Sequence, residues 1–535
     1  MNNQLFNTNL ESITTNEAGG NAYAFSPKHE LAQYISTGTF SDAYYVEAKH
    51  QLNAMLLLLA KLDTTFIAKA AIYSREQAHM KDAPALLCAY LATKDIHLLK
   101  NIFPRVIDNV KMLRNFTQII RSGVTGRKSF GNAPKKLIQD FLTKQTPEQL
   151  LRNSVGKNPT LGDIIKMVHP KAVNPGQNAM FAYLTGNKYD LEYLPMKVRD
   201  YIRWRKGEEV SFKGVSWVPF QLLTGKKLST DEWAEILTHA NWHMTRMNIN
   251  TAARHSVFDN HPEIITVIAN RLKDPIAIEK NKVFPYQLLA TYMNLSVNIP
   301  NQILDALEDA IQIALKNIPD TTGNVVICPD VSGSMSMSIT GYRKGRSSKV
   351  KCIDAAALVA SGFKWKALDR CTILPFDTKV HSLEFEPTSV LDTAKILSTY
   401  GGGGTNCACP LEHLNNTNHQ ADLVIFISDN ESWYHTNRSQ DHWPHRWDYS
   451  LDVPTTVAAE WDKYKVNNPN AKLVCIDVQP YDTTQISDRD DVLNIGGFSD
   501  NIFNTISKFI NEDNNDSDST DNIHLFVNEI ENIDL

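Results

Sequence analysis

The chain has 535 residues, 42% of them hydrophobic and 21% charged, a composition typical of globular proteins. This length exceeds what one hydrophobic core supports, so we expect at least two domains. The longest apolar run, residues 54–60, is too short to span a bilayer, and the first twenty residues lack the basic-then-apolar pattern of a signal peptide. Seven cysteines, an odd number, indicate reduced thiols in a cytoplasmic protein. We expect no membrane partner.

The net charge of −5 is unevenly distributed along the chain. Residues 1–320 carry 37 Lys and Arg against 29 Asp and Glu, whereas residues 321–535 carry 17 against 30. The basic excess is concentrated in residues 101–210, which hold 19 basic and 9 acidic residues. This asymmetry favours a polyanion partner for the first part only, although a solvated basic helix face explains the same charges about equally well.

From about residue 45 to 320, apolar residues recur at the spacing of amphipathic helices. Residues 47–77, 84–94 and 104–123 show the pattern most clearly, and short stretches of Gly, Pro, Asp or Asn separate the helices. Consecutive helical hairpins over this length predict a HEAT-like solenoid. Such a solenoid curves and offers a long concave binding surface.

After residue 320 the pattern changes to apolar strands that alternate with helices. The strands are predicted in residues 324–330, 371–377, 421–429 and 471–479. Continuous apolar strands in this arrangement predict a doubly wound α/β domain, in which helices cover both faces of a parallel sheet. Residues 511–522 are acidic and polar, and we expect a mobile loop there.

Oxygen-bearing side chains follow the predicted strands at the edge where a doubly wound sheet binds its ligands. The sequence DVSGSMS follows the first strand, the loop GGGGTN precedes the third, and the third strand ends in aspartate. Two carboxylates and three hydroxyls suit a hard cation that keeps some water ligands, most simply Mg²⁺. The predicted metal ligands are Asp330, Ser332, Ser334, Thr405 and Asp429.

The Asp-x-Ser-x-Ser sequence followed by Thr and Asp is the pattern of a metal-ion-dependent adhesion site, and residues 321–510 resemble a von Willebrand factor A domain. The resemblance implies that an acidic side chain of a protein partner completes the coordination of the metal. The alternative is structural: Ser332 or Ser334 caps a helix, and residues 401–404 form a turn.

Other motifs do not support an enzyme. In GVTGRKS, residues 123–129, lysine follows arginine and no strand precedes the loop, which excludes a phosphate-binding loop. HANWH, residues 239–243, lacks the glutamate of a zinc protease. Cys407 and Cys409 form a lone CxC pair, more typical of core packing than of a metal site. We expect no catalytic residues.

Several stretches, and their combination with an A domain, resemble the Ro autoantigen family, whose helical part is the TROVE module. They are NEAGGNAYAF, ISTGTFSDAYY, DTTFIAKAAIYSREQAHMKDAPALL, TLGDIIKMVHPKA, MNINTAARHSVF, KVFPYQLLATYM and SDNESW. The resemblance covers nearly the whole chain and indicates a bacterial or phage-type homologue. It predicts a TROVE module in residues 1–320, a von Willebrand factor A domain in residues 321–510 and an acidic tail in residues 511–535.

The Ro resemblance implies a ring of HEAT-like helices that the A domain closes. It further implies small noncoding Y-like RNA on a basic outer surface, the single-stranded 3′ ends of misfolded RNA in the central hole, and an exoribonuclease as partner. A hole lined by Lys and Arg admits a single strand and excludes a duplex by its width. A ring closed within one chain needs no second copy, so we expect a monomer.

Matched helix by helix, residues 151–172 fall where the family contacts RNA. The first candidates there are Arg152, Lys157, Lys166, His169 and Lys171. The densest basic cluster lies upstream and supplies the second set: Arg127, Lys128, Lys135 and Lys136. Arg246 and Arg254 are further candidates. Each lysine alone is more simply a solvated charge, and His169 alone a helix cap. Arg254 could equally anchor a helix end through a buried ion pair.

Two functions from different classes remain open. The first is a non-enzymatic RNA-binding ring that acts in RNA quality control. The second is a metal-dependent protein-interaction scaffold that ignores RNA. RNA binding that falls with salt favours the first, and acidic-peptide binding that depends on Asp330 without RNA binding favours the second.

Overall fold

The computed structural model divides into two compact units, each considered by itself. The helical unit comprises residues 63–283, 294–314 and 534–535, and the sheet unit comprises residues 1–62, 284–293 and 315–533. The structure describes residues 13–15, 21–24, 26–37, 48–280, 283, 285–315, 321, 323–339, 349–383, 390–400, 402–429, 456–478, 483–487, 489, 491–496, 501–511 and 525–535. No helix in these ranges is both long and apolar enough to cross a membrane.

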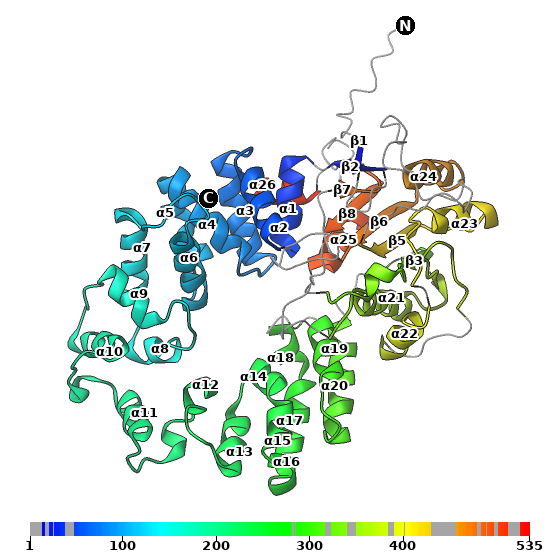
Figure 1. Ribbon diagram of the computed structural model, residues 1–535. Helices are drawn as coiled ribbons and strands as arrows, with labels where there is room; N and C mark the ends of the chain where they lie inside the picture. The colour runs from blue at the N-terminus through cyan, green and yellow to red at the C-terminus, as the bar shows by residue number, and fades with distance from the viewer. Residues whose placement is uncertain are drawn as a thin grey trace. The chain divides into compact units, whose positions relative to one another are not determined.

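Consecutive helices of the helical unit follow one another along a curved path, as Figure 1 shows from α3 to α17. Polar side chains cap the N-termini of several helices. Asp63 and Asn109, for example, accept hydrogen bonds from the backbone N–H groups of Phe66 and Met112. The helices are α3 (Thr64–Glu76), α4 (Ala83–Lys94), α5 (Ile96–Val106), α6 (Val110–Ser122), α7 (Asn132–Thr143), α8 (Pro147–Arg152), α9 (Leu161–Val168), α10 (Pro175–Thr185), α11 (Met196–Lys206), α12 (Phe220–Leu223), α13 (Thr230–His239), α14 (Trp242–Met247), α15 (Ile249–Arg254), α16 (Val257–Asn260), α17 (Glu263–Leu272), α18 (Pro275–Lys280) and α20 (Asn301–Ala314). The predicted succession of short amphipathic helices is confirmed.

The sheet unit is built around a five-stranded parallel sheet of order β4-β3-β5-β6-β8. Its strands are β3 (Val325–Pro329), β4 (Cys371–Ile373), β5 (Leu423–Ser428), β6 (Lys472–Asp477) and β8 (Val492–Gly496). The first four lie in the predicted ranges, and β8 was not predicted. The helices are α1 (Pro27–Thr37), α2 (Ala48–Leu59), α19 (Pro285–Met293), α21 (Cys352–Ala367), α22 (Val390–Leu397), α23 (Cys409–Thr417), α24 (Thr456–Asn467), α25 (Asn501–Asn511) and α26 (Leu525–Glu531).

Helices cover both faces of this sheet, with α23 and α24 on one side and α21 and α25 on the other (Figure 1). Alternate strand residues such as Val326, Val424 and Leu473 form one core with the fully buried Trp461 and with Tyr464 of α24. This alternation is expected of strands buried on both faces. The predicted fold class, helical repeats together with a doubly wound α/β domain, is therefore confirmed.

The compact units do not follow the predicted domain boundaries at residues 320 and 510. The first sixty-two residues belong to the sheet unit because β2 (Asn21–Ala24) pairs antiparallel with β1 (Ile13–Thr15) and with β7 (Thr483–Thr484), and because α1 packs against β8 and α26. Part of the predicted tail forms helix α26, which packs against α1. Residues 512–522 of the predicted loop, and residues 430–433 of the SDNESW stretch, lie outside the described residues.

Candidate metal site and nucleic-acid interface

The predicted metal ligands lie at the switch point of the sheet. From β3 the chain passes to β4 on one side and then crosses to β5 on the other, so the carboxyl ends of β3 and β5 are neighbours at a reversal of strand order. Asp330 directly follows β3, and Asp429 directly follows β5. Ligands of doubly wound sheets bind at such points because the loops diverge there and leave a crevice.

Hydrogen bonds fix both carboxylate oxygens of Asp330, a fully buried side chain. The backbone N–H of Ser332 donates to Oδ1 at 2.7 Å, and the Ser428 hydroxyl on the neighbouring strand donates to Oδ2 at 2.5 Å. Ser332 Oγ and Ser334 Oγ are hydrogen-bonded at 3.1 Å. Three of the five predicted ligands therefore form one connected group, supported by Ser428, which was not predicted.

Backbone hydrogen bonds tie the glycine-rich loop to the loop that follows β3. The N–H of Gly333 donates to the carbonyl of Gly403 at 3.1 Å, and the N–H of Gly402 donates to the carbonyl of Val331 at 3.0 Å. Thr405 follows two residues later and is 2% exposed. The fourth predicted ligand is thus carried by a loop that is held against the first three.

The site concentrates negative charge in a buried environment. Burial, together with the nearby charge of Asp429, raises the pKa of Asp330 to about 7, although the hydrogen bonds from Ser332 and Ser428 act in the opposite direction. Two buried carboxylates at neighbouring strand ends repel each other unless a proton or a cation compensates their charge. Two carboxylates and three hydroxyls are oxygen donors of the kind that Mg²⁺ prefers.

Two of the other three strands, β4 and β6, also lead to buried aspartates at this edge, which the sequence interpretation did not select. Asp377 lies beyond β4, with Oδ1 2.9 Å from His381 Nε2, and Asp477 ends β6 in register with Ser428. The signal was present, since an aspartate closes three of the four predicted strands and Asp477 lies two residues before the end of the fourth. Within the described residues, no three His, Cys, Asp or Glu side chains are grouped closely enough to hold a metal ion by themselves. A cation at this edge would therefore need the hydroxyl ligands.

The structure also shows where the cysteine pair and the rejected motifs lie. Cys407 and Cys409 are buried in the core between the sheet and its helices, and all seven cysteines are buried. Residues 123–126 form a turn after α6 rather than a loop after a strand. His239, in the HANWH stretch, lies 3.3 Å from Glu235 one helical turn earlier.

The first set of predicted RNA contacts lies on the surface of the helical unit around α8 and α9. Arg152 ends α8, Lys157 lies on the following loop, Lys166 is on α9, and all three are exposed. His169 caps α9 in the left-handed conformation, with φ of +50°, while its side chain stays exposed; Lys171 follows two residues later and is exposed as well. His169 therefore caps the helix, as the structural alternative predicts, while its side chain remains accessible to a ligand.

In the second set of predicted RNA contacts, two of the four side chains already make contacts within the protein. Arg127 donates to the carbonyl oxygens of Ser129 and Ala92 at 2.7 and 3.0 Å, so its guanidinium anchors the turn. Lys136 pairs with Asp140 at 2.9 Å. Lys128 is exposed and Lys135 half-buried.

The remaining candidates differ from each other. Arg246 is half-buried, with its guanidinium 5.9 Å from the centre of the Trp242 ring. Arg254 is exposed and donates to Thr251 at 3.1 Å. The suggested buried ion pair of Arg254 is therefore wrong, because the side chain stays in solvent on its own helix.

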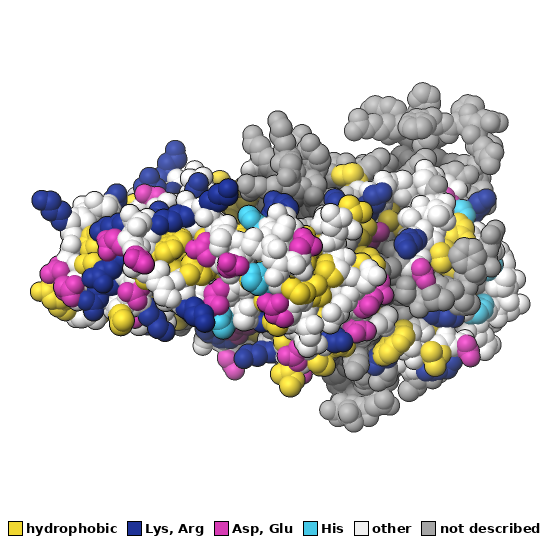
Figure 2. Space-filling view, turned by 90° about the horizontal axis from the view of Figure 1, so that it is seen from below, with side chains coloured by type: hydrophobic (Ala, Val, Ile, Leu, Met, Phe, Trp, Pro, Cys, Tyr) yellow, Lys and Arg dark blue, Asp and Glu magenta, His cyan; other side chains and the backbone are white. Residues whose placement is uncertain are grey.

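Charge alone does not delimit an interface on the face that Figure 2 shows, where Lys and Arg side chains are interspersed with Asp and Glu. Nonspecific polyanion binding depends on cations that are not already neutralised. Among the described residues, none of Arg152, Lys157, Lys166 and Lys171 has a carboxylate within 4.0 Å, whereas Lys136 has one. The cations around α8 and α9 are therefore better candidates for phosphate contacts than the upstream cluster.

Comparison with known proteins relates the sheet unit to one specific type of A domain. The family model described as the Ro60 vWA domain matches residues 324–442. A protein of Deinococcus radiodurans named RNA-binding protein RO60 is 21% identical over 459 residues, which cover 79% of this chain and 84% of that protein. The chain is therefore similar to a Ro60 protein over most of its length.

Two further matches relate the chain to other proteins. A Caenorhabditis elegans protein, also named RNA-binding protein RO60, is 24% identical over 290 residues, which cover 52% of this chain but only 41% of that protein. The crystal structure of the Deinococcus radiodurans Ro (RSR) protein matches with a TM-score of 0.59 and 17% identity, over 91% of this chain and all of that one. The structural match establishes a shared fold.

The loop that carries Lys157 is held by Arg114 of α6, which donates to the carbonyl of Val155. Gly156 adopts a φ of +121°, and a Cβ there would overlap the Arg114 guanidinium. We expect Gly156→Ala to lower the free energy of unfolding by about 1–3 kcal/mol, from backbone strain and displacement of Arg114. Urea denaturation followed by circular dichroism measures this change.

Gly186→Ala is the matched control for that substitution. Gly186 also has a positive φ, +78°, but nothing lies within 4 Å of where its Cβ would be. Its replacement therefore reports backbone strain alone. An equal destabilisation by the two substitutions would contradict the packing role of Arg114.

Proposed function

We propose that this chain is a cytoplasmic RNA-binding scaffold of the Ro60 family, without enzymatic activity. The observation that carries the proposal is the set of exposed cations around α8 and α9 that no described carboxylate neutralises. Two relatives that bear the name RNA-binding protein support the same function. Exposed Lys and Arg side chains bind phosphates and release counterions, which provides affinity without reading the base sequence.

The RNA ligands that we propose follow from the Ro resemblance. They are a small noncoding Y-like RNA and the single-stranded 3′ ends of misfolded RNA, with an exoribonuclease as the partner that processes them. The chain would act as a monomer and would present the RNA rather than cleave it.

The decisive experiment is filter binding of the purified protein to a duplex RNA with and without a single-stranded 3′ tail, across 50 to 300 mM salt. We expect the tail to increase affinity and the affinity to fall steeply as salt rises. Absence of RNA binding at the lowest salt would refute the proposal. Equal affinity for both RNAs would refute the recognition of 3′ ends but not RNA binding itself.

We also propose that the sheet unit binds Mg²⁺ through Asp330, Ser332, Ser334, Thr405 and Asp429. The buried pair of aspartates and the connected hydroxyls support this proposal. When bound, Mg²⁺ would supply positive charge that attracts a carboxylate of a protein partner. The aspartates would orient that charge and the serine hydroxyls would complete the ligand set. Isothermal titration of the chelated protein with Mg²⁺ tests the proposal, and no binding at millimolar concentrations would refute it.

A further inference from the structure

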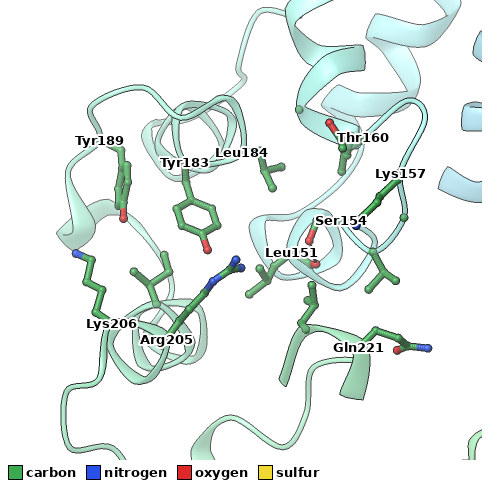
Figure 3. Close-up of a pocket in the computed structure, with 16 residues that line it drawn as sticks. Leu151, Ser154, Lys157, Thr160, Tyr183, Leu184, Tyr189, Arg205, Lys206 and Gln221 are labelled. Atoms are coloured by element: carbon green, nitrogen blue, oxygen red, sulfur yellow. Dashed lines mark hydrogen bonds between the residues drawn. The ribbon is translucent and has the colours of Figure 1, made fainter. Parts of the chain in front are cut away.

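The helical unit contains a cavity of about 810 Å³ between α8 and α12. It is lined by residues from α8, the loop after α8, α9, α10, the loop after α10, α11 and α12, several of which Figure 3 labels. The volume lies within the usual range for sites that bind small molecules. The cavity shares only Lys157 with the exposed cations around α8 and α9.

The floor of the cavity is apolar and rigidly placed. Leu151, Leu161 and Ile202 contribute to the lining and are at most 2% exposed. Gly162 also lines it, and a Cβ at this position would overlap the carbonyl oxygen of Leu184. Helices α9 and α10 are therefore in close contact here, and the cavity does not depend on a movable side chain at its base. Such a floor accommodates a flat apolar surface.

Two tyrosines form one wall. The rings of Tyr183 and Tyr189 are 5.4 Å apart between centroids and nearly perpendicular, at 86°. Both side chains are half-buried, and in Figure 3 the Tyr183 hydroxyl points toward Arg205. Aromatic rings held in this way offer a face on which a nucleobase can stack.

The polar part of the cavity lining carries an excess of positive charge. Arg205, Lys206 and Lys157 line the cavity, and none of the sixteen lining residues is Asp or Glu. The guanidinium of Arg205 donates to the buried Tyr201 hydroxyl at 3.1 Å and extends into the cavity. It has no carboxylate within 4.0 Å among the described residues, so it keeps donors and charge for an anionic ligand.

We propose that this cavity holds one unstacked nucleotide of a bound RNA strand. The base would lie against the Tyr183 ring and the apolar floor, and its phosphate would contact Arg205 and Lys206. Ser154, Thr160 and Gln221 would offer hydrogen bonds to the base edges. The inference rests on the proposed RNA binding, and it adds a site that recognises a base to a surface that otherwise recognises phosphates.

The test combines base removal in the RNA with replacement of the cavity residues. The full-length protein is titrated with a single-stranded 10-mer and with a series of the same 10-mers that each carry one abasic position. In the wild type we expect one abasic position to reduce affinity by about 5–150-fold, the range that corresponds to one stacked base. In Tyr183→Leu the same abasic position should cost less than about 2-fold, because the stacking partner is gone.

Arg205→Gln provides an independent variant in case Tyr183→Leu fails to fold, which near-ultraviolet circular dichroism would reveal. We expect this variant to weaken binding of the intact 10-mer by about 5–10-fold at 50 mM salt and by less at 300 mM. Arg203→Gln is its matched control: the residue lies two positions earlier on α11, does not line the cavity and lies 3.8 Å from Glu208. A loss of the same size in both variants would overturn the assignment.

The outcomes separate this proposal from general RNA binding. If the 10-mers bind but no abasic position matters, the cavity proposal is wrong and RNA binding stands. A second outcome is that the wild type binds AMP or UMP, that Tyr183→Leu loses this binding, and that the affinity for the 10-mers is unchanged in the variant. The cavity would then bind free nucleotides, and the proposal that it holds a nucleotide of an RNA strand would be overturned. If the wild type binds no RNA, the proposed function fails, and the mononucleotide titration alone decides whether the cavity binds nucleotides.

Discussion

Replacing the four exposed cations around α8 and α9 with glutamine is expected to lower RNA affinity on the order of 10²–10³-fold at 50 mM salt. The residues are Arg152, Lys157, Lys166 and Lys171, and all four side chains are exposed. Each phosphate contact to a single strand contributes a slope of about −0.7 in the logarithm of affinity against the logarithm of salt concentration. Loss of four contacts should therefore reduce the slope by about 3 and make the two proteins converge at high salt.

A control variant with the same change in net charge isolates the effect of position. Lys100, Lys280, Lys395 and Lys463 are exposed and lie outside the α8–α9 region. Their replacement with glutamine should change affinity less than about 5-fold, because only long-range attraction is lost and salt screens it. A comparable loss in the control would mean that RNA responds to net charge and not to this surface. Filter binding across the same salt series measures both variants.

Asp330→Ala is expected to abolish the effect of Mg²⁺ on the stability of the sheet unit. In the wild type, Mg²⁺ at about 100 times its dissociation constant should raise the free energy of unfolding by about 2.7 kcal/mol, because the ion binds only the folded site. The variant loses one of the two carboxylates and should show no such rise. Thermal denaturation with EDTA and with a series of Mg²⁺ concentrations measures the difference.

Two further variants show whether the effect belongs to the site. Asp330→Asn keeps the shape of the side chain and an oxygen that accepts the Ser332 N–H, so it should fold without responding to Mg²⁺. Asp354→Asn alters another buried aspartate, hydrogen-bonded to the Lys351 N–H at the start of α21, and its response to Mg²⁺ should remain. Neither Asp330 variant should change RNA affinity more than about 2-fold. A loss as large as that of the α8–α9 variant, in folded protein, would refute the separation of the two functions.

Local patterns were enough to locate four of the five strands of the parallel sheet and to select the candidate metal ligands. The apolar stretches that contain β3 and β5 are continuous, and each is followed by a polar residue at the edge where parallel sheets bind ligands. Asp330 and Asp429 could be selected for that reason. Asp377 follows β4 by four residues and Asp477 is the last residue of β6, yet neither belongs to an Asp-x-Ser-x-Ser pattern, and only the register of the strands shows that they share the same edge.

The roles of individual cations could not be read from their number. Arg127 lies in the densest basic cluster of the sequence, but its guanidinium binds two backbone carbonyls. Lys157, in a less basic stretch, is exposed. Whether a cation is free for phosphate depends on carbonyls and carboxylates that fold against it, such as the carbonyl of Ala92, thirty-five residues from Arg127.

The sequence by itself indicated the class of this protein: helical repeats, a doubly wound domain with an Asp-x-Ser-x-Ser pattern, and a resemblance to the Ro family. These properties depend on periodicity and on short motifs, which act over a few residues. Only the tertiary structure decided that the first strands belong with the sheet unit, since β2 pairs with β7 more than 450 residues away. The same holds for the cavity between α8 and α12, because packing brings together side chains that no local pattern relates.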